Sequence, residues 1–160
     1  ETPAVKADYG HFVDGDPVTR IVIPKFSVDM IVVEGTGSRS LNTGAGHYPD
    51  TPLPGQPGNI GIAGHRTMYG KPFNRIHEFT AGDKVYLITP FDKYTYEILP
   101  PFDGHANPWV VEANSWDVVS PTAESMLTMT ACHPIGSARQ RIVARAKLVA
   151  TEPLVNATAR

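Results

Sequence analysis

The strongest constraint on this chain is that its apolar residues fall into short extended runs separated by proline and glycine. The 15 prolines and 14 glycines leave no long stretch with helical periodicity. With 160 residues, the chain has room for one domain with a real core. Eight runs have the composition of strands: 20–23, 30–34, 59–63, 84–89, 94–99, 109–113, 127–132 and 139–149. We therefore expect an all-β (β-rich) fold, a single eight-stranded barrel.

Helical signals are brief and confined to the connections between these runs. Three segments have them, residues 40–43, 71–79 and 122–127. Residues 44–58 are rich in turn-forming residues, so we expect one long surface loop there. Three regions follow from this pattern: a flexible N-terminal leader (1–17), the folded domain (18–150) and a C-terminal tail (151–160).

Composition excludes several classes of function. The net charge is −2 and the 14 lysines and arginines are scattered, which argues against a nucleic-acid partner. No apolar run reaches the ~18 residues of a membrane-spanning helix. The carboxylates near the expected barrel loops are too dispersed for a calcium site, and no phosphate-binding loop is present. We therefore expect no metal and no cofactor.

The only cysteine, Cys132, ends a strand-like run and precedes a proline. In the run 127–132, alternation places Thr130 and Cys132 on the face opposite the apolar side chains. The thiol should therefore point away from the core, where a free cysteine is usually kept for its reactivity. The alternative is an inert, half-buried thiol. A single cysteine excludes an intrachain disulfide.

Two arginines of the last run, Arg139 and Arg141, share one face of their strand. If residues 133–138 form the connection, an antiparallel register places Cys132 opposite Arg139 and Thr130 opposite Arg141. Directly opposed Cβ atoms lie ~5 Å apart, so both guanidinium groups could reach the thiol. The alternative is that both arginines are solvated ends on an exposed face.

A cysteine nucleophile needs an acid or base partner, and histidine is the usual choice because it titrates near neutrality. Of the six histidines, His65 follows a glycine-rich strand-like run, where a side chain can project into a groove from a rigid support. His133 is a poor partner because strand neighbours point to opposite faces. The alternative for each histidine is an ordinary surface or structural role.

These residues resemble the motifs of sortases, the cysteine transpeptidases that attach secreted proteins to the cell wall of Gram-positive bacteria. Residues 64–66 (GHR) resemble the histidine motif, 127–132 (LTMTAC) the nucleophile strand TLxTC, and 141–143 (RIV) the arginine strand. The order of the three motifs also agrees, and the resemblance covers about residues 18–150. One departure is Ala131, where the family usually has threonine. Because Ala131 should point inward, we expect little catalytic effect.

Other segments are most similar to class E sortases of actinobacteria, which resemble a housekeeping enzyme and are associated with an LAXTG signal in place of LPXTG. The segments are residues 48–49 with 53–59, 64–73, and 132–134.

The resemblance implies a sortase-type barrel, with residues 18–150 as the catalytic domain, and a reaction. Cys132 would attack the Thr–Gly carbonyl of a C-terminal sorting signal (LAXTG/LPXTG-like), and a peptidoglycan precursor amine would resolve the thioacyl enzyme. His65 would act as general acid and base. Arg141 would stabilise the oxyanion or hold the substrate backbone, with Arg139 as the competing candidate. The partners implied are therefore the sorting-signal peptide and that amine.

Four residues are expected to contact the signal peptide: Tyr48, Tyr69, Thr130 and Arg139. Trp109 and Trp116 are more typical of packing residues than of substrate platforms. The resemblance also implies the extracellular face of the cell membrane, held there only through an N-terminal anchor absent from this chain. Two alternatives remain open: a cysteine peptidase that hydrolyses the same intermediate, and a non-catalytic β-barrel binding module.

Overall fold

Nine strands lie within residues 10–154, the part of the chain that the computed structural model describes. Most are short because turn-forming residues interrupt the apolar runs. The strands are β1 (Pro17–Ile23), β2 (Val28–Glu34), β3 (Ala45–His47), β4 (Asn59–Gly64), β5 (Lys84–Ile88), β6 (Asp92–Ile98), β7 (Trp109–Glu112), β8 (Met126–His133) and β9 (Gln140–Pro153).

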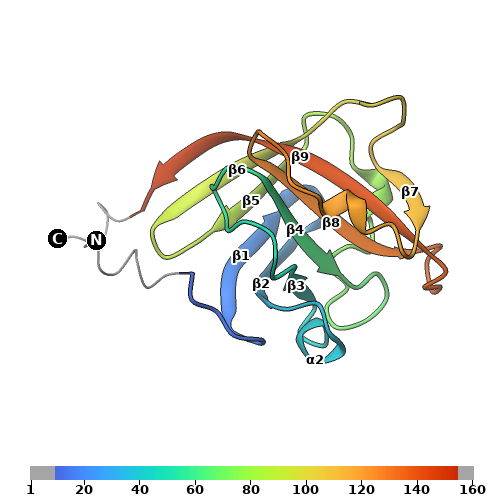
Figure 1. The fold of residues 1–160 in the computed structure, drawn as a ribbon, viewed down its shortest axis with the longest axis horizontal. Coiled ribbons are helices and arrows are strands. Elements are labelled where there is room, and N and C mark those ends of the chain that lie inside the picture. Colours follow the sequence, from blue (N-terminus) through green and yellow to red (C-terminus); the bar gives the residue numbers. More distant parts are fainter. Residues whose placement is uncertain (1–9, 155–160) are drawn as a thin grey trace.

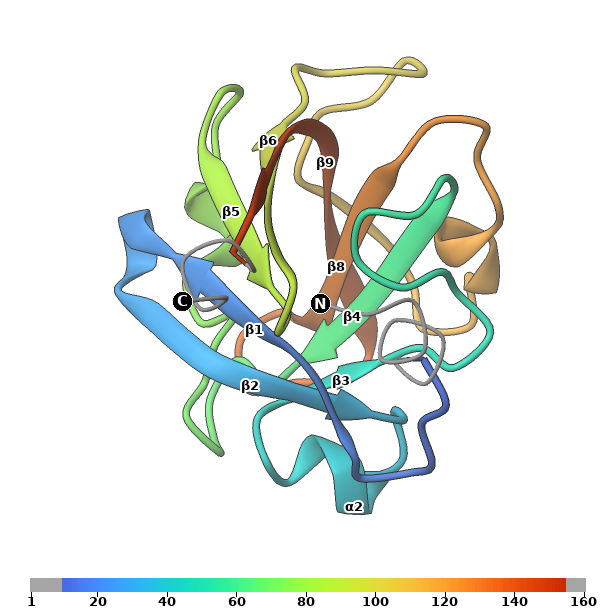
Figure 2. The ribbon, with the colours of Figure 1, turned by 90° about the vertical axis from the view of Figure 1, so that its left-hand side faces the viewer.

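Eight of these strands close into a barrel. They follow the order β6-β5-β1-β2-β3-β4-β8-β9, and β9 pairs with β6 again to complete the ring (Figure 2). The pairs β2–β3 and β4–β8 are parallel and the others are antiparallel. β7 stands outside the ring as an extra strand on β9 (Figure 1). The predicted eight-stranded barrel is therefore confirmed.

The barrel encloses one hydrophobic core. Alternation along the strands points their aliphatic side chains inward, and burying each large one contributes roughly 1.5–3 kcal/mol. The β8 side chains that belong to this core are Leu127, Met129 and Ala131, as the sequence predicts. The largest fully buried side chains elsewhere include Ile21, Ile60, Ile62, Phe73, Ile76, Leu87, Tyr96 and Ile98.

The expected helix at 71–79 is wrong, although its apolar side chains are buried as that pattern requires. Only Ile76–Glu78 is helical, as a single 3-10 turn (η2). The preceding residues Tyr69, Gly70 and Lys71 all have positive φ angles of 35–81°, which an α-helix cannot accommodate. The segment therefore packs as a loop whose apolar side chains close the barrel.

Of the other two predicted helices, one overlaps a helix of the structure and the other is wrong. α2 (Ser38–Leu41) overlaps the expected helix at 40–43. The expected helix at 122–127 is wrong, because β8 already begins at Met126. A 3-10 turn, η3 (Trp116–Val119), lies earlier in that connection. A further 3-10 turn, η1 (Pro24–Phe26), joins β1 to β2.

The expected surface loop at 44–58 contains a strand that the sequence did not predict. β3 pairs in parallel with the end of β2 and antiparallel with β4, and all three of its residues are buried. Its Ala-Gly-His sequence has no β-forming residue, so pairing on both sides, not local propensity, makes it a strand. Of the rest of the loop, residues 48–58, only Tyr48 lines the candidate site.

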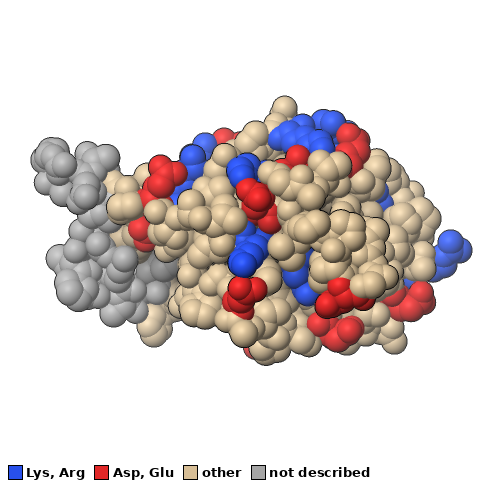
Figure 3. Space-filling view, turned by 90° about the horizontal axis from the view of Figure 1, so that it is seen from above, with Lys and Arg blue, Asp and Glu red and all other residues tan. Residues whose placement is uncertain are grey.

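The first and last strands mark the extent of the described sheet. β1 begins at Pro17, and β9 runs to Pro153, into the expected tail. Residues 1–9 and 155–160, which make up the rest of the leader and tail, lie outside the described residues. On the face shown in Figure 3, positive and negative side chains are interspersed, and neither sign covers a continuous area.

Candidate active site

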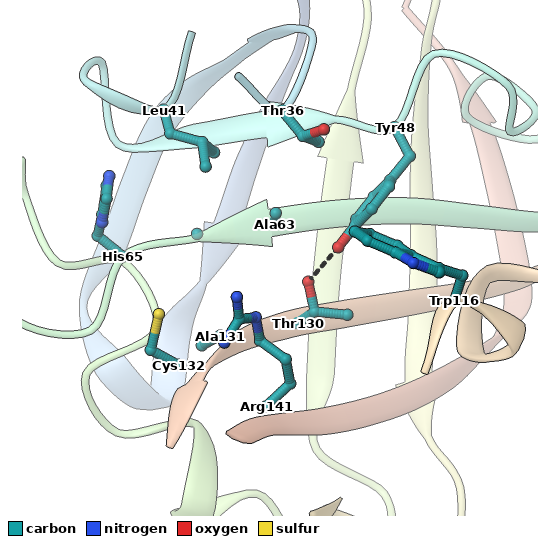
Figure 4. A pocket seen from close by; sticks show the side chains of 11 residues that line it. Thr36, Leu41, Tyr48, Ala63, His65, Trp116, Thr130, Ala131, Cys132 and Arg141 are labelled. Atoms are coloured by element: carbon teal, nitrogen blue, oxygen red, sulfur yellow. Dashed lines mark hydrogen bonds between the residues drawn. The ribbon is translucent and has the colours of Figure 1, made fainter. Parts of the chain in front are cut away.

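The candidate site is a groove of about 160 Å³ on the outer face of β4 and β8 (Figure 4). β4 and β8 run parallel here, with Ala63 paired to Thr130, so their C-terminal ends reach the same end of the groove. The groove brings together all three residues predicted for catalysis. It is lined by Thr36, Leu41, Tyr48, Ala63, Gly64, His65, Trp116, Thr130, Ala131, Cys132 and Arg141.

Cys132 lies near the end of β8, and its sulfur points into the groove (Figure 4). The thiol is free and half-buried, so it is neither locked in the core nor fully solvated. Its neighbour Ala131 is 3% exposed and packs into the core. Alternation on β8 thus places the only thiol of the chain on the groove side, as the sequence predicts.

His65 is the first residue after β4 and lies at the same end of the groove as the sulfur (Figure 4). Its backbone is held on both sides: its N–H donates to the carbonyl of Gly44 at 3.2 Å, and its carbonyl accepts from Phe73 at 3.1 Å. Its ring packs at 5.0 Å between centroids against that of Tyr69. Nε2 is buried without a hydrogen-bond partner among the described residues, so it is available to a reacting group.

Arg141 lies directly opposite Cys132 in the β8–β9 pair, and its guanidinium points into the groove (Figure 4). Nη1 donates to the carbonyls of Ala138 at 2.8 Å and Gln140 at 3.0 Å. These two bonds fix one edge of the guanidinium and leave its other donors toward the groove. The structure thus brings a permanent cation next to the thiol.

The expected register of β8 and β9 is wrong by two residues. β8 continues through His133, which pairs with Gln140, so the connection comprises 134–139 instead of 133–138. Pro134 has no N–H to extend the ladder, which ends the strand there. Because β8 ends one residue later than expected and β9 also begins one residue later, the partner of Cys132 is Arg141 and not Arg139. Since the shift is by two, it changes no side chain's face.

Of the four residues predicted to contact the substrate, two line the groove and two do not. Tyr48 and Thr130 line the groove and join each other through their hydroxyl groups at 2.8 Å (Figure 4). Tyr69 packs against the ring of His65 and does not line the groove. Arg139 is exposed in the β8–β9 connection, also outside the groove lining.

The position of Tyr48 depends on a glycine in the strand beneath it. A Cβ atom at Gly61 would lie 2.7 Å from the Tyr48 ring and 3.0 Å from the side chain of Val119. Glycine therefore lets the ring lie close against β4, which side chains would otherwise prevent. Burial raises the pKa of the Tyr48 phenol, so the hydroxyl stays protonated and can donate a hydrogen bond.

The far end of the groove is closed by the segment that contains η3. The guanidinium of Arg145 donates to the carbonyl of Val118 at 2.6 Å and to the hydroxyl of Thr128 at 2.9 Å. The amide of Asn59 donates to the carbonyls of Val118 and Ser120, each at 3.0 Å. Thr128 faces the outside of the barrel, but the segment that contains η3 covers it, so it is fully buried. The groove is thus a short open stretch of an otherwise covered barrel face.

Sequence reasoning missed Thr36, Leu41 and Trp116 as groove residues. The indole of Trp116 is 69% exposed and still lines the groove, so it is not the packing residue that we expected. Trp109, in contrast, stacks on His105 at 4.3 Å and packs near Arg145. The only sequence signal for Trp116 was that it is an aromatic residue in a turn-rich connection. Trp109 gave the same signal, so the sequence did not distinguish the two.

Within residues 10–154, no group of three histidine, cysteine or acidic side chains is placed to hold a metal ion. The groove supplies a thiol, an imidazole and a guanidinium, with a phenol and a hydroxyl beside them. A nucleophile, an acid–base group and a fixed cation in one groove are the components of covalent acyl transfer.

Comparison with known proteins agrees with this chemistry. A family model described as a sortase domain matches residues 21–149. Sortase D of Bacillus subtilis (strain 168) is 30% identical over 131 residues, which cover 79% of this chain and 61% of the relative. Sortase SrtE1 of Streptomyces coelicolor is 28% identical over 166 residues, which cover 92% of this chain and 45% of the relative. The chain thus spans 45–61% of the length of these two curated relatives.

A solved structure, that of sortase E from Streptomyces avermitilis, has the same fold. It is 31% identical and superposes with a TM-score of 0.78, covering 91% of this chain and 95% of the other.

Proposed function

Because the chain belongs to the sortase family, we propose that it is a cysteine transpeptidase that cleaves C-terminal sorting signals between Thr and Gly and joins the new end to a cell-wall precursor amine. The observation that carries the proposal is the meeting of Cys132, His65 and Arg141 in one groove. Three separated segments contribute these side chains, and the barrel positions all three.

In the proposed reaction, the thiol of Cys132 gives its proton to His65, and the sulfur attacks the Thr carbonyl carbon of the signal. The C–N bond to Gly then breaks, the leaving amine takes a proton from His65, and a thioester remains. The acceptor amine gives a proton to His65 and attacks the thioester, which releases the thiolate. Arg141 stabilises the negative oxygen that forms in both steps, because its guanidinium is fixed beside Cys132 and permanently charged.

For the substrate, we propose a signal of the LAXTG or LPXTG type, with class E as the subclass. Support comes from the relatives, two of which carry the class E name and one the class D name. In this proposal Tyr48 and Thr130, which line the groove, contact the signal peptide. Trp116 adds an apolar surface to the same groove.

We place the protein at the outer cell surface, where sorting signals and cell-wall precursors meet. Within the described residues, no helix is both long enough and apolar enough to span a bilayer.

The test is intact-mass analysis of the protein after incubation with LAXTG and LPXTG peptides, with and without an amine acceptor. A thioacyl adduct that disappears when the amine is added, with a matching amide product, supports the transpeptidase. Steady cleavage without amide product would instead identify the peptidase. Neither adduct nor cleavage with either peptide would contradict the proposal.

Arg141→Lys is expected to reduce kcat roughly 10²- to 10³-fold, the order seen when one oxyanion donor is removed. Lysine keeps the charge but loses the planar fork that the carbonyls of Ala138 and Gln140 hold in place. Arg139→Lys is the matched control, because Arg139 lies outside the groove lining. Peptide-cleavage kinetics decide between them: an equal loss for both variants would remove the special role of Arg141.

Tyr48→Phe is expected to raise KM for the signal peptide roughly 2- to 10-fold and to change kcat less than twofold. The substitution removes only the hydroxyl that bonds to Thr130, a bond of a kind worth about 0.5–1.5 kcal/mol. Tyr69→Phe is the matched control and should leave KM unchanged, because Tyr69 does not line the groove. If Tyr48→Phe lowers kcat with KM unchanged, the hydroxyl acts in the chemistry and not in binding.

A further inference from the structure

The residue after His65 is a buried cation placed behind the nucleophile. Arg66 is 4% exposed and does not line the groove. Its Nη1 donates to the carbonyl oxygen of Cys132 at 3.1 Å and contacts Nδ1 of His133 at 3.2 Å. Its Nη2 contacts Nδ1 of His77 at 3.0 Å. One side chain thus joins the end of β4, the end of β8 and the η2 turn.

The bond to Cys132 falls where the β-sheet itself stops supporting β8. The parallel β4–β8 pairing ends at Ala63 and Thr130, so Cys132 has no partner on β4. On that side the guanidinium of Arg66 takes the place of a strand as hydrogen-bond donor. Because Arg66 follows His65 directly, this bond also ties the backbone of the proposed base to the backbone of the proposed nucleophile.

The two histidines must be neutral to make these contacts. A guanidinium has only donors, so Nδ1 of His77 and Nδ1 of His133 must both accept and each ring must carry its proton on Nε2. A second proton on either ring would bind to Nδ1, and the new N–H would then face an N–H of the guanidinium. Further out, the carboxylate of Glu78 lies 3.7 Å from Nε2 of His77, the position expected to carry the proton.

We propose that Arg66 is a positioning residue that holds Cys132 and His65 in register, with His77 and His133 as its acceptors, and that protonation of His133 weakens this hold in acid. The proposal deepens the proposed function and rests on it for the roles of Cys132 and His65. Cys132, His77 and His133 are the titratable groups that contact or face the guanidinium, and Glu78 is the charged group behind His77.

The direction of the pH effect follows from His133. Burial, then the charge of Arg66 and then His77, lower the pKa of His133. The unfolded chain therefore takes up the proton first, near the ordinary histidine pKa of about 6.5. The stabilisation by the Arg66 cluster is complete above that pH and is lost as the pH falls from there through the lower pKa that His133 has in the folded state.

The main variant is Arg66→Met, which keeps an apolar stem of similar length and removes every donor. Its kcat for signal-peptide cleavage at pH 7.5 is expected to fall roughly 10²-fold, the order for a misplacement of about 1 Å, with KM changed less than threefold. Arg75→Met is the matched control, since Arg75 is a half-exposed arginine of the same connection paired with Glu78. A kcat within twofold of the wild type for Arg66→Met, in a protein that melts normally, would overturn the proposal.

Two further readouts need no substrate, so they remain valid even if the wild type forms no acyl adduct and the proposed function fails. The first is nitrogen-15 NMR of the histidine rings, which is expected to show His77 and His133 protonated on Nε2, and His133 titrating at higher pH in Arg66→Met. Protonation on Nδ1, or an unchanged titration, contradicts the cluster.

The second readout is the rate of iodoacetamide alkylation of Cys132 between pH 5 and 8. In a His77→Gln/His133→Gln variant, each glutamine can accept from Arg66 but cannot be protonated. The fall in rate on the acid side is expected to move to lower pH than in the wild type. If Arg66→Met does not fold, this variant and Arg66→Lys carry the test, and identical acid profiles for wild type and the double variant overturn the switch.

Discussion

Cys132→Ala is expected to abolish both the acyl adduct and the amide product, a loss of at least about 10⁴-fold in turnover. No other thiol exists in the chain to replace it. The proposed reaction passes through a thioester on this sulfur, so alanine leaves the peptide and the amine without a covalent route. Intact mass and peptide-product chromatography measure both losses in one experiment.

The same substitution should leave the fold intact, which separates a catalytic role from a structural one. Cys132 is half-buried and has no disulfide, and the alanine before it already packs into the core. The melting temperature of Cys132→Ala should therefore stay within a few degrees of the wild type. Ala131→Gly is the complementary control, because it changes a side chain on the core face of β8 but keeps the thiol. Turnover by Cys132→Ala at the wild-type rate would support a binding module or another nucleophile.

The three proposed catalytic side chains could be found in the sequence because each sits on or just after a strand with a clear local pattern. Alternation alone places the thiol of Cys132 on the outer face, and the glycine-rich end of β4 marks His65. Choosing between Arg139 and Arg141 was harder, because the register depends on where one turn begins. A turn that starts one residue later moves the partner of Cys132 by two residues, and local sequence does not fix that start.

The parts that could not be predicted depend on contacts between distant segments. β3 is a strand because β2 and β4 pair with it on both sides, although its sequence favours a turn. Trp116 reaches the groove because Asn59 and Arg145 hold the η3 segment against the barrel. The bridge made by Arg66 needs η2 to bring His77 beside it. None of these contacts leaves a periodic signal along the chain.

His47→Leu is expected to lower the free energy of unfolding by about 3–5 kcal/mol, because it leaves the buried carboxyl group of Glu34 without its hydrogen-bond partner. Glu34 ends β2, His47 ends β3, and the two are register partners in the parallel pair. Nδ1 of His47 lies 2.7 Å from Oε1 of Glu34, and both side chains are less than a tenth exposed. For a chain of this length, the loss corresponds to a fall of roughly 10–15 °C in melting temperature.

The pair also holds the loop that carries Tyr48, so its loss should reach the groove. Nε2 of His47 bonds to the carbonyl of Pro52 at 2.8 Å and to the hydroxyl of Thr51 at 3.1 Å. That hydroxyl in turn donates to the carbonyl of Tyr48 at 2.7 Å and accepts from the N–H of Gly61. We expect KM for the signal peptide to rise in His47→Leu, in addition to the loss of stability.

A double-mutant cycle separates the pair from the packing around it. Glu34→Leu and His47→Leu each leave the other member of the pair buried without its partner. In Glu34→Leu/His47→Leu both members are gone, so the loss of stability should be well below the sum of the two single losses. The matched control is Asp29→Leu, which breaks the exposed ion pair with Arg20 and should hardly change the melting temperature, since solvent screens that pair. Strictly additive losses in urea unfolding would show that Glu34 and His47 stabilise the barrel independently, and that the β2–β3 junction is held by backbone pairing alone.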